Sequence, residues 1–309
     1  MQKIWALLKK HVLEDFSGGL YLSIAVLLAL SITINYMIDL EDGIIDKDVG
    51  KPIRVLWYFL LFGFAYHTAA VITLYFNGRL NLLRSANYWV YTTIGLVILS
   101  WNVGFPYLTA VVRWVLPDYR VFSWAYSTGS NLINFLTNAA PLFFVMLLTR
   151  KPDSLGVTCK NVDLKPYGWI LLILVPIVAI GSFEPGFKNY YPTYRPNAVA
   201  EAMHWPKWLP PLIYELAYGL DFFNVEIMFR GFMVIGLSQW LGKDAILPMV
   251  VTYCFLHFGK PVGEAISSIA GGYVLGVLAF YTRNIWGGVL VHMGLAWMME
   301  LAAWLQKNI

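Results

Sequence analysis

The sequence predicts an all-α fold, a polytopic bundle of transmembrane helices with eight or nine spans. Two observations support this prediction. Hydrophobic residues make up 59% of the 309 residues and charged residues only 13%, whereas soluble domains carry roughly 25% charged residues. The apolar residues also gather in long runs, many of them near the length of about 20 residues that crosses a bilayer. We therefore expect an integral, multi-pass membrane protein.

Nine apolar segments are candidates for these spans. Two are short and contain a proline, Pro176 in one and Pro248 in the other, so either could be kinked or cross only part of the membrane. One is longer than a hydrocarbon core of about 30 Å requires, so we expect it to tilt or to end in the interface. The nine segments are residues 20–38, 55–76, 88–115, 123–148, 167–183, 209–240, 245–258, 264–282 and 285–305.

We expect the chain to divide into two parts, residues 1–149 with about four spans and residues 150–309 with the polar residues of interest. The net charge of +4 is small and scattered among short loops, which argues against a nucleic-acid partner. The two cysteines, Cys159 and Cys254, fall in a predicted loop and a predicted helix, so they indicate neither a disulfide framework nor a thiolate metal cluster. Membrane lipids are the first partners that this composition predicts.

Two charged residues interrupt the apolar segment 209–240. In the stretch "FNVEIMFRGF", Glu226 and Arg230 are four residues apart and would share one face of a helix. Charges inside a membrane are costly unless they are paired or hydrated, so an intrahelical ion pair is the natural arrangement. The pair either neutralises itself while it fixes a neighbouring helix, or it belongs to a functional site.

Two histidines on other predicted helices favour a functional site. His257 lies in "TYCFLHFGKP" and His292 in "GGVLVHMGLAW", and both could converge on Glu226 inside the bundle. A carboxylate and an imidazole that share a water make a general base, and a second imidazole can donate to an oxyanion.

The same three side chains also match the ligand count of a zinc site, but there is no HExxH helix, so we expect no cofactor and keep zinc as the weaker alternative. Hydrolysis and transport both remain open from these residues. A transporter should show related halves, and we find no clear internal repeat.

The order of these residues resembles the CPBP family, the CAAX-protease and bacteriocin-processing group of intramembrane glutamate-dependent endopeptidases, also called Abi. The family pattern is Glu-Glu-x-x-x-Arg, then Phe-x-x-x-His, then His-x-x-x-Asn or Asp. The resemblance covers about residues 150–305. The matching stretches are "EIMFRG" at 226–231, "YCFLH" at 253–257, "GGYVLG" at 271–276 and "WGGVLVH" ending at His292.

The resemblance implies hydrolysis of a peptide bond by a water molecule that a carboxylate and His257 activate, with His292 stabilising the oxyanion. Glu226 and Arg230 match the second glutamate and the arginine of the first motif. The implied substrate is a peptide or a membrane protein, and the implied location is the cytoplasmic membrane of a bacterium.

The sequence departs from the family pattern at three positions. Val225 replaces the first, water-activating glutamate, Ala296 replaces the third-motif asparagine, and Tyr253 replaces phenylalanine. An endopeptidase therefore needs another carboxylate as its base. The alternative is a catalytically inactive relative that acts as a membrane binding protein, scaffold or immunity protein.

Other carboxylates could replace the missing glutamate. Glu226 is the first candidate, because it lies next to Val225, about 100° around the helix. Asp221 is the second, because it lies four residues before Val225, about 5.4 Å along the same face. Glu264 and Glu300 are further candidates, although Glu264 could instead begin a helix favourably.

Overall fold

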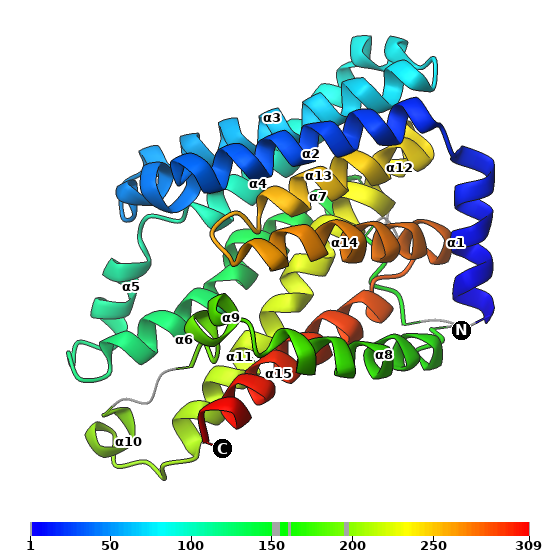
Figure 1. The fold of residues 1–309 in the computed structure, drawn as a ribbon. Coiled ribbons are helices and arrows are strands. Elements are labelled where there is room, and N and C mark those ends of the chain that lie inside the picture. Colours follow the sequence, from blue (N-terminus) through cyan, green and yellow to red (C-terminus); the bar gives the residue numbers. More distant parts are fainter. Residues whose placement is uncertain (1, 150–154, 160–161, 195–197, 309) are drawn as a thin grey trace.

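The computed structural model describes residues 2–149, 155–159, 162–194 and 198–308, and within these ranges the regular structure is helical, with no strand. Long helices lie side by side in a single bundle, and the short α1 (Gln2–Asp15) stands apart at one end, across the ends of several others (Figure 1). The all-α prediction is therefore confirmed.

The first half of the chain forms a hairpin of long helices followed by a bent segment. In order, its further elements are α2 (Gly18–Ile38), the π-helical turn η1 (Leu40–Ile45), the 3₁₀ turn η2 (Asp46–Asp48), α3 (Ile53–Phe76), η3 (Leu80–Arg84), α4 (Ala86–Val103), α5 (Leu108–Val115), α6 (Phe122–Asn134), the π-helical η4 (Phe135–Ala139) and α7 (Ala140–Thr149).

The second half contains the predicted site residues. Its elements are α8 (Lys165–Gly181), α9 (Pro185–Tyr190), α10 (Val199–Ala202), α11 (Leu209–Glu226), the π-helical η5 (Ile227–Gly236), α12 (Ser238–Leu241), η6 (Gly242–Ala245), α13 (Ile246–Phe255), α14 (Val262–Thr282) and α15 (Trp286–Asn308).

The described helices include fewer spans than the sequence predicts. Five helical stretches are long and apolar enough to cross a membrane, and a sixth arises if α4 and α5, which are bent by 51°, form one broken span. Pro106 lies at this break, and proline interrupts a helix. The five stretches are Gly18–Ile38, Ile53–Phe76, Phe122–Leu148, Val262–Thr282 and Trp286–Lys307.

The prediction of eight or nine spans is not confirmed, and each missing span has a physical reason. The helix α8 has 17 residues, and α13 has only 10, which at 1.5 Å per residue is about half of the hydrocarbon thickness. The helix α11 is long enough but carries Glu215, Asp221 and Glu226. Each of the nine apolar segments nevertheless contains helix.

The outer surface of the bundle is apolar. On α2 the side chains of Leu22, Val26 and Leu30 are 67%, 49% and 58% exposed, and Leu172 and Ile180 on α8 are also largely exposed. Soluble proteins rarely expose such large contiguous apolar faces, whereas a lipid environment accommodates them. Together with the long apolar helices, this surface indicates an integral membrane protein.

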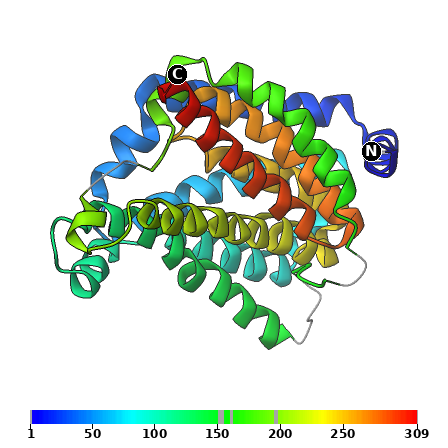
Figure 2. The same cartoon turned by 90° about the horizontal axis from the view of Figure 1, so that it is seen from below.

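The unit formed by α11 and η5 runs through the middle of the bundle (Figures 1 and 2). It packs against α6 and α4 on one side and against α15 and α14 on the other. All ten residues of η5 and all ten of α13 are buried. The main buried core contains residues from both halves of the chain, so the division near residue 150 stays a prediction.

Candidate functional site

Glu226 is the last residue of α11 and lies at the centre of the bundle. Its side chain is completely buried, and that of Arg230 is 1% exposed. The distance from Arg230 Nη1 to Glu226 Oε1 is 2.9 Å, so the predicted ion pair forms. None of the three guanidinium nitrogens has a well-directed hydrogen bond among the described residues. The contact is therefore a charge pair without the two parallel hydrogen bonds that arginine and carboxylate can form.

His292 reaches the same carboxylate from α15. Its Nδ1 lies 2.7 Å from Glu226 Oε1, within hydrogen-bond distance. Because an ionised carboxylate only accepts hydrogen bonds, Nδ1 carries the proton in this contact. Sequence reasoning predicted that His257 would be the partner of the carboxylate, and the structure brings His292 to it instead.

Gly288, one turn before His292, allows α15 to approach Glu226. A Cβ atom at this position would lie 2.0 Å from Glu226 Oε2, so only glycine fits. Sequence reasoning missed this residue, although the pair "GG" one turn before a histidine in a membrane helix was a visible signal. Glu226 Oε2 has no hydrogen-bond partner among the described residues.

Tyr253 from α13 is a second residue that sequence reasoning did not assign to the site. Its hydroxyl lies 2.5 Å from His292 Nε2, and the guanidinium carbon of Arg230 lies 4.5 Å from the centre of its ring. Such a cation–π contact stabilises a buried arginine. The signal was the replacement of phenylalanine by tyrosine in the second motif, because a buried tyrosine hydroxyl usually has a hydrogen-bond partner.

His257 lies in the turn after α13 and joins this group through Tyr253. Its Nδ1 is 2.8 Å from the backbone oxygen of Tyr253, and the two ring centres are 4.6 Å apart. Within the part of the chain that the structure describes, no hydrogen bond links His257 to a carboxylate. A carbonyl oxygen only accepts, so Nδ1 is protonated and the neutral ring presents a free lone pair at Nε2.

Residues of α2 hold the turn that contains His257. Asn35 Nδ2 donates to the carbonyl of Phe258 at 3.0 Å, and the Tyr36 hydroxyl donates to the carbonyl of Lys260 at 2.6 Å. The first half of the chain thus contributes to the placement of a predicted site residue.

The other candidate carboxylates do not meet either histidine. Glu264 pairs with Lys260 at 3.4 Å, and Glu300 accepts hydrogen bonds from the backbone and hydroxyl of Thr193. Asp221 accepts from Asn134 Nδ2 at 2.6 Å on a different face of α11. Of the candidates for the missing glutamate, Glu226 is the one in contact with a predicted site histidine. Ala296, one turn after His292, is buried and contributes no polar group.

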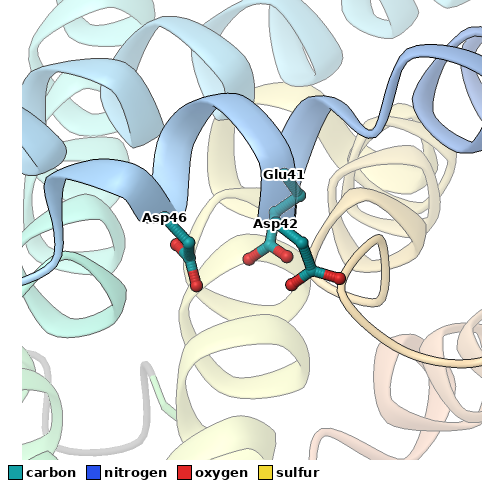
Figure 3. A group of neighbouring side chains, drawn as sticks. All are labelled: Glu41, Asp42 and Asp46. Carbon is teal, nitrogen blue, oxygen red and sulfur yellow. The ribbon is translucent and has the colours of Figure 1, made fainter.

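A cluster of three carboxylates lies outside this site, at the end of α2. Ligand atoms of Glu41, Asp42 and Asp46 all lie within 4.8 Å of one another (Figure 3). The Tyr58 hydroxyl lies within hydrogen-bond distance of both Glu41 and Asp46, and Arg54 pairs with Asp46 at 2.8 Å. Burial raises the pKa of Glu41 to about 7. Because Tyr58 and Arg54 already engage Glu41 and Asp46, we assign no cofactor to the cluster.

A comparison with known protein families gives a match. Residues 207–298 match the model described as type II CAAX prenyl endopeptidase Rce1-like. This segment begins just before α11, ends within α15 and contains the Glu226–Arg230 pair with both histidines. Comparisons with curated proteins and with solved structures give no match. The segment 207–298 is therefore similar to the Rce1-like type II CAAX prenyl endopeptidases, which are part of the CPBP group that the sequence motifs resemble.

Proposed function

We propose that the protein is an intramembrane endopeptidase that hydrolyses a peptide bond with an activated water. The observation that carries this proposal is a continuous series of polar contacts in the apolar core, from Arg230 to Glu226, His292, Tyr253 and His257. Buried ionisable groups are costly in a membrane and mark functional sites. The match of this region to a family of CAAX prenyl endopeptidases supports the same reaction.

In this proposal, His257 is the base that activates water. Its backbone contact fixes the proton on Nδ1 and leaves Nε2 as the acceptor. A water held at Nε2 gives up a proton to the ring as its oxygen attacks the carbonyl carbon of the substrate. The imidazolium then returns this proton to the departing amine nitrogen, and the products are a carboxylate and an amine.

Glu226 acts in this proposal through His292 and Tyr253. Because Glu226 holds the proton of His292 on Nδ1, Nε2 accepts from the Tyr253 hydroxyl. This contact positions the hydroxyl, whose single proton turns from His292 Nε2 to the oxyanion as the carbonyl is attacked. The Tyr253 hydroxyl is the group that we propose to stabilise the oxyanion in place of the missing asparagine at position 296. Arg230 pairs with Glu226 and holds the Tyr253 ring. His292 is therefore a positioning residue rather than the direct oxyanion donor that the family pattern implies.

The test uses the full-length protein in detergent micelles and a fluorogenic peptide that ends in a farnesylated CAAX sequence, with the unprenylated peptide beside it. We expect hydrolysis by the wild-type protein and its loss in His257→Ala. The matched control is His67→Ala, because His67 contacts Tyr88 on α4 and lies outside the site. Full activity of His257→Ala, or no hydrolysis of either peptide by the wild type, would contradict the proposal.

A second candidate function is favoured by Val225. A catalytically inactive relative would retain the buried Glu226–Arg230 pair as a structural element and bind a peptide without cleaving it. If the protein is such an inactive relative, the wild type should bind the farnesylated peptide without hydrolysing it, and His257→Ala should bind the peptide equally well. In Val225→Glu, which restores the first motif, an appearance of hydrolysis would further support this alternative.

A further inference from the structure

A polar cavity of about 340 Å³ lies on the face of α11 that carries Asp221 and Val225. Its walls come mainly from α4, α6, α11 and η5, with Asn138 from η4, and they do not include Glu226, Arg230 or either site histidine. Its volume is in the range of small-molecule pockets, about 300–1,000 Å³. The cavity is therefore separate from the group of contacts around Glu226, and the inference below does not depend on the proposed hydrolysis.

Four asparagines line this cavity, and the amide nitrogen of each has an acceptor within the protein. Asn102 donates to Asn134 Oδ1 at 2.7 Å, and Asn134 donates to Asp221 Oδ1 at 2.6 Å. Asn224 donates weakly to the same carboxylate oxygen at 3.4 Å, and Asn138 donates to the backbone oxygen of Asn224 at 2.8 Å. Each of these amide nitrogens thus has at least one acceptor within the protein.

Two acceptors are left over. Asn138 Oδ1 and Asn224 Oδ1 are buried and have no hydrogen-bond partner among the described residues. The two residues are 2% and 1% exposed, respectively. If the side-chain oxygen and nitrogen of Asn138 were exchanged, its oxygen would face the backbone oxygen of Asn224, and two acceptors would meet. The same exchange in Asn224 would bring its oxygen against the Asp221 carboxylate. Both orientations are therefore fixed. A buried acceptor without a donor costs about 1–3 kcal/mol, so these oxygens call for a donor from outside the chain.

Asp221 is the acidic residue that lines the cavity. Arg54 also lines the cavity, but its guanidinium donates to Asp46 Oδ1 and to the carbonyl of Val103. Within the described ranges, no lysine or arginine forms an ion pair with Asp221, which keeps an acceptor oxygen for a further partner. The remaining walls are largely apolar, with Val225 and Met228 among them.

We propose that this cavity binds a primary alkylammonium group. The ammonium has three donors, which match the Asp221 carboxylate and the two unpartnered amide oxygens, and the alkyl chain fits the apolar wall. A bare metal ion would leave most of the 340 Å³ unfilled. The source of the group is a free amine or the side chain of a lysine in a peptide, and both have the same chemistry.

The test measures binding of n-butylammonium chloride to the full-length protein in detergent by titration calorimetry at pH 7.5. Tetramethylammonium chloride is the first control, because it has the same charge and no N–H donor. We expect saturable binding of butylammonium and none of tetramethylammonium. Competition by acetyl-lysine methylamide identifies a lysine side chain as the source, and its absence identifies a free amine.

Two variants locate the site. Asp221→Asn removes the charge and should weaken butylammonium binding at least tenfold, and Ser130→Leu fills the cavity from α6 and should abolish binding while Asp221 remains. Glu215→Gln is the matched control on the same helix outside the cavity, and it should bind like the wild type. Absence of butylammonium binding, equal binding of tetramethylammonium, full competition by sodium chloride, or binding that persists in both variants would overturn the proposal.

Discussion

Two carboxylates on different faces of α11, Glu226 and Asp221, have opposite surroundings. Glu226 on one face contacts Arg230 and His292, and the backbone of α15 closes over it at Gly288. Asp221, little more than one turn earlier, contacts only neutral amides and borders a cavity. The first carboxylate has its counter-charge within the chain, whereas the second has none within ion-pair distance among the described residues.

The difference shows what each face can do. Removing a charge from water is costly, and a partner inside the protein offsets that cost permanently. A carboxylate with an internal counter-charge therefore serves as a fixed element of the protein, and one without it is available to a ligand. Changes on the Glu226 face should alter stability and hydrolysis, and changes on the Asp221 face should alter binding.

The largest effect on stability is expected from Glu226→Gln. This change leaves the buried Arg230 without a counter-charge, and breaking a buried ion pair costs about 3–5 kcal/mol. Thermal and denaturant unfolding in detergent measure the loss. The double change Glu226→Gln with Arg230→Met should regain most of the stability but not the hydrolysis. A Glu226→Gln protein as stable as Glu215→Gln would show that the ion pair contributes little.

The next effect is expected from Tyr253→Phe, which restores the family residue and removes the hydroxyl beside His292. Loss of one oxyanion donor typically lowers kcat by about 10²–10³-fold, whereas loss of an ordinary hydrogen bond costs about 1 kcal/mol of stability. We therefore expect a large fall in kcat with a small change in unfolding midpoint and in KM. Unchanged kcat in this variant would remove Tyr253 from the proposed mechanism.

Gly288→Ala tests how closely α15 is packed on Glu226. The added Cβ would overlap Glu226 Oε2, and overpacking of this kind costs about 1–3 kcal/mol. Gly271→Ala on α14 is the matched control, because no atom lies within 4 Å of the added Cβ. We expect a lower unfolding midpoint for Gly288→Ala alone. Equal midpoints would mean that the carboxylate can move aside freely.

An effect confined to one range of pH is expected from Glu41, which provides a reference acid outside the membrane spans. Burial raises its pKa from the usual 4.5 to about 7, so the folded protein binds the proton more tightly than the unfolded chain. Stability should therefore fall as pH rises from about 4.5 to about 7 and change little above that. The unfolding midpoint, measured across this pH range, should change less with pH in Glu41→Gln than in the wild type. An unchanged slope would contradict the raised pKa.

Local features of the site could be predicted from the sequence, and its tertiary contacts could not. The Glu226–Arg230 pair follows from helical spacing alone, because residues four apart share a face. The choice between His257 and His292 as the partner of Glu226 depends on how α13 and α15 pack, which spacing does not determine. The roles of Tyr253 and Gly288 also depend on distances between helices.

For the fold, too, local features could be predicted from the sequence better than the breaks and irregular turns of the helices. Apolar runs predict helices reliably, and the helix Val262–Thr282 lies within two residues of its predicted bounds. The run 88–115 was predicted as one span, although Pro106 within it gave a signal for the bend. The π-helical η5 could not be distinguished from an α-helix by its apolar pattern, because all ten of its residues are buried.

The shortness of α13 has a consequence for how the protein is assembled in the membrane. Ten residues span about 15 Å, too little for the helix to be held across the hydrocarbon on its own. It packs against α14, which follows it in the chain, and against α3, which precedes it by nearly two hundred residues. The helix that carries Tyr253 is therefore held in place partly by the N-terminal half, and the segment 207–298 shares its core with those helices.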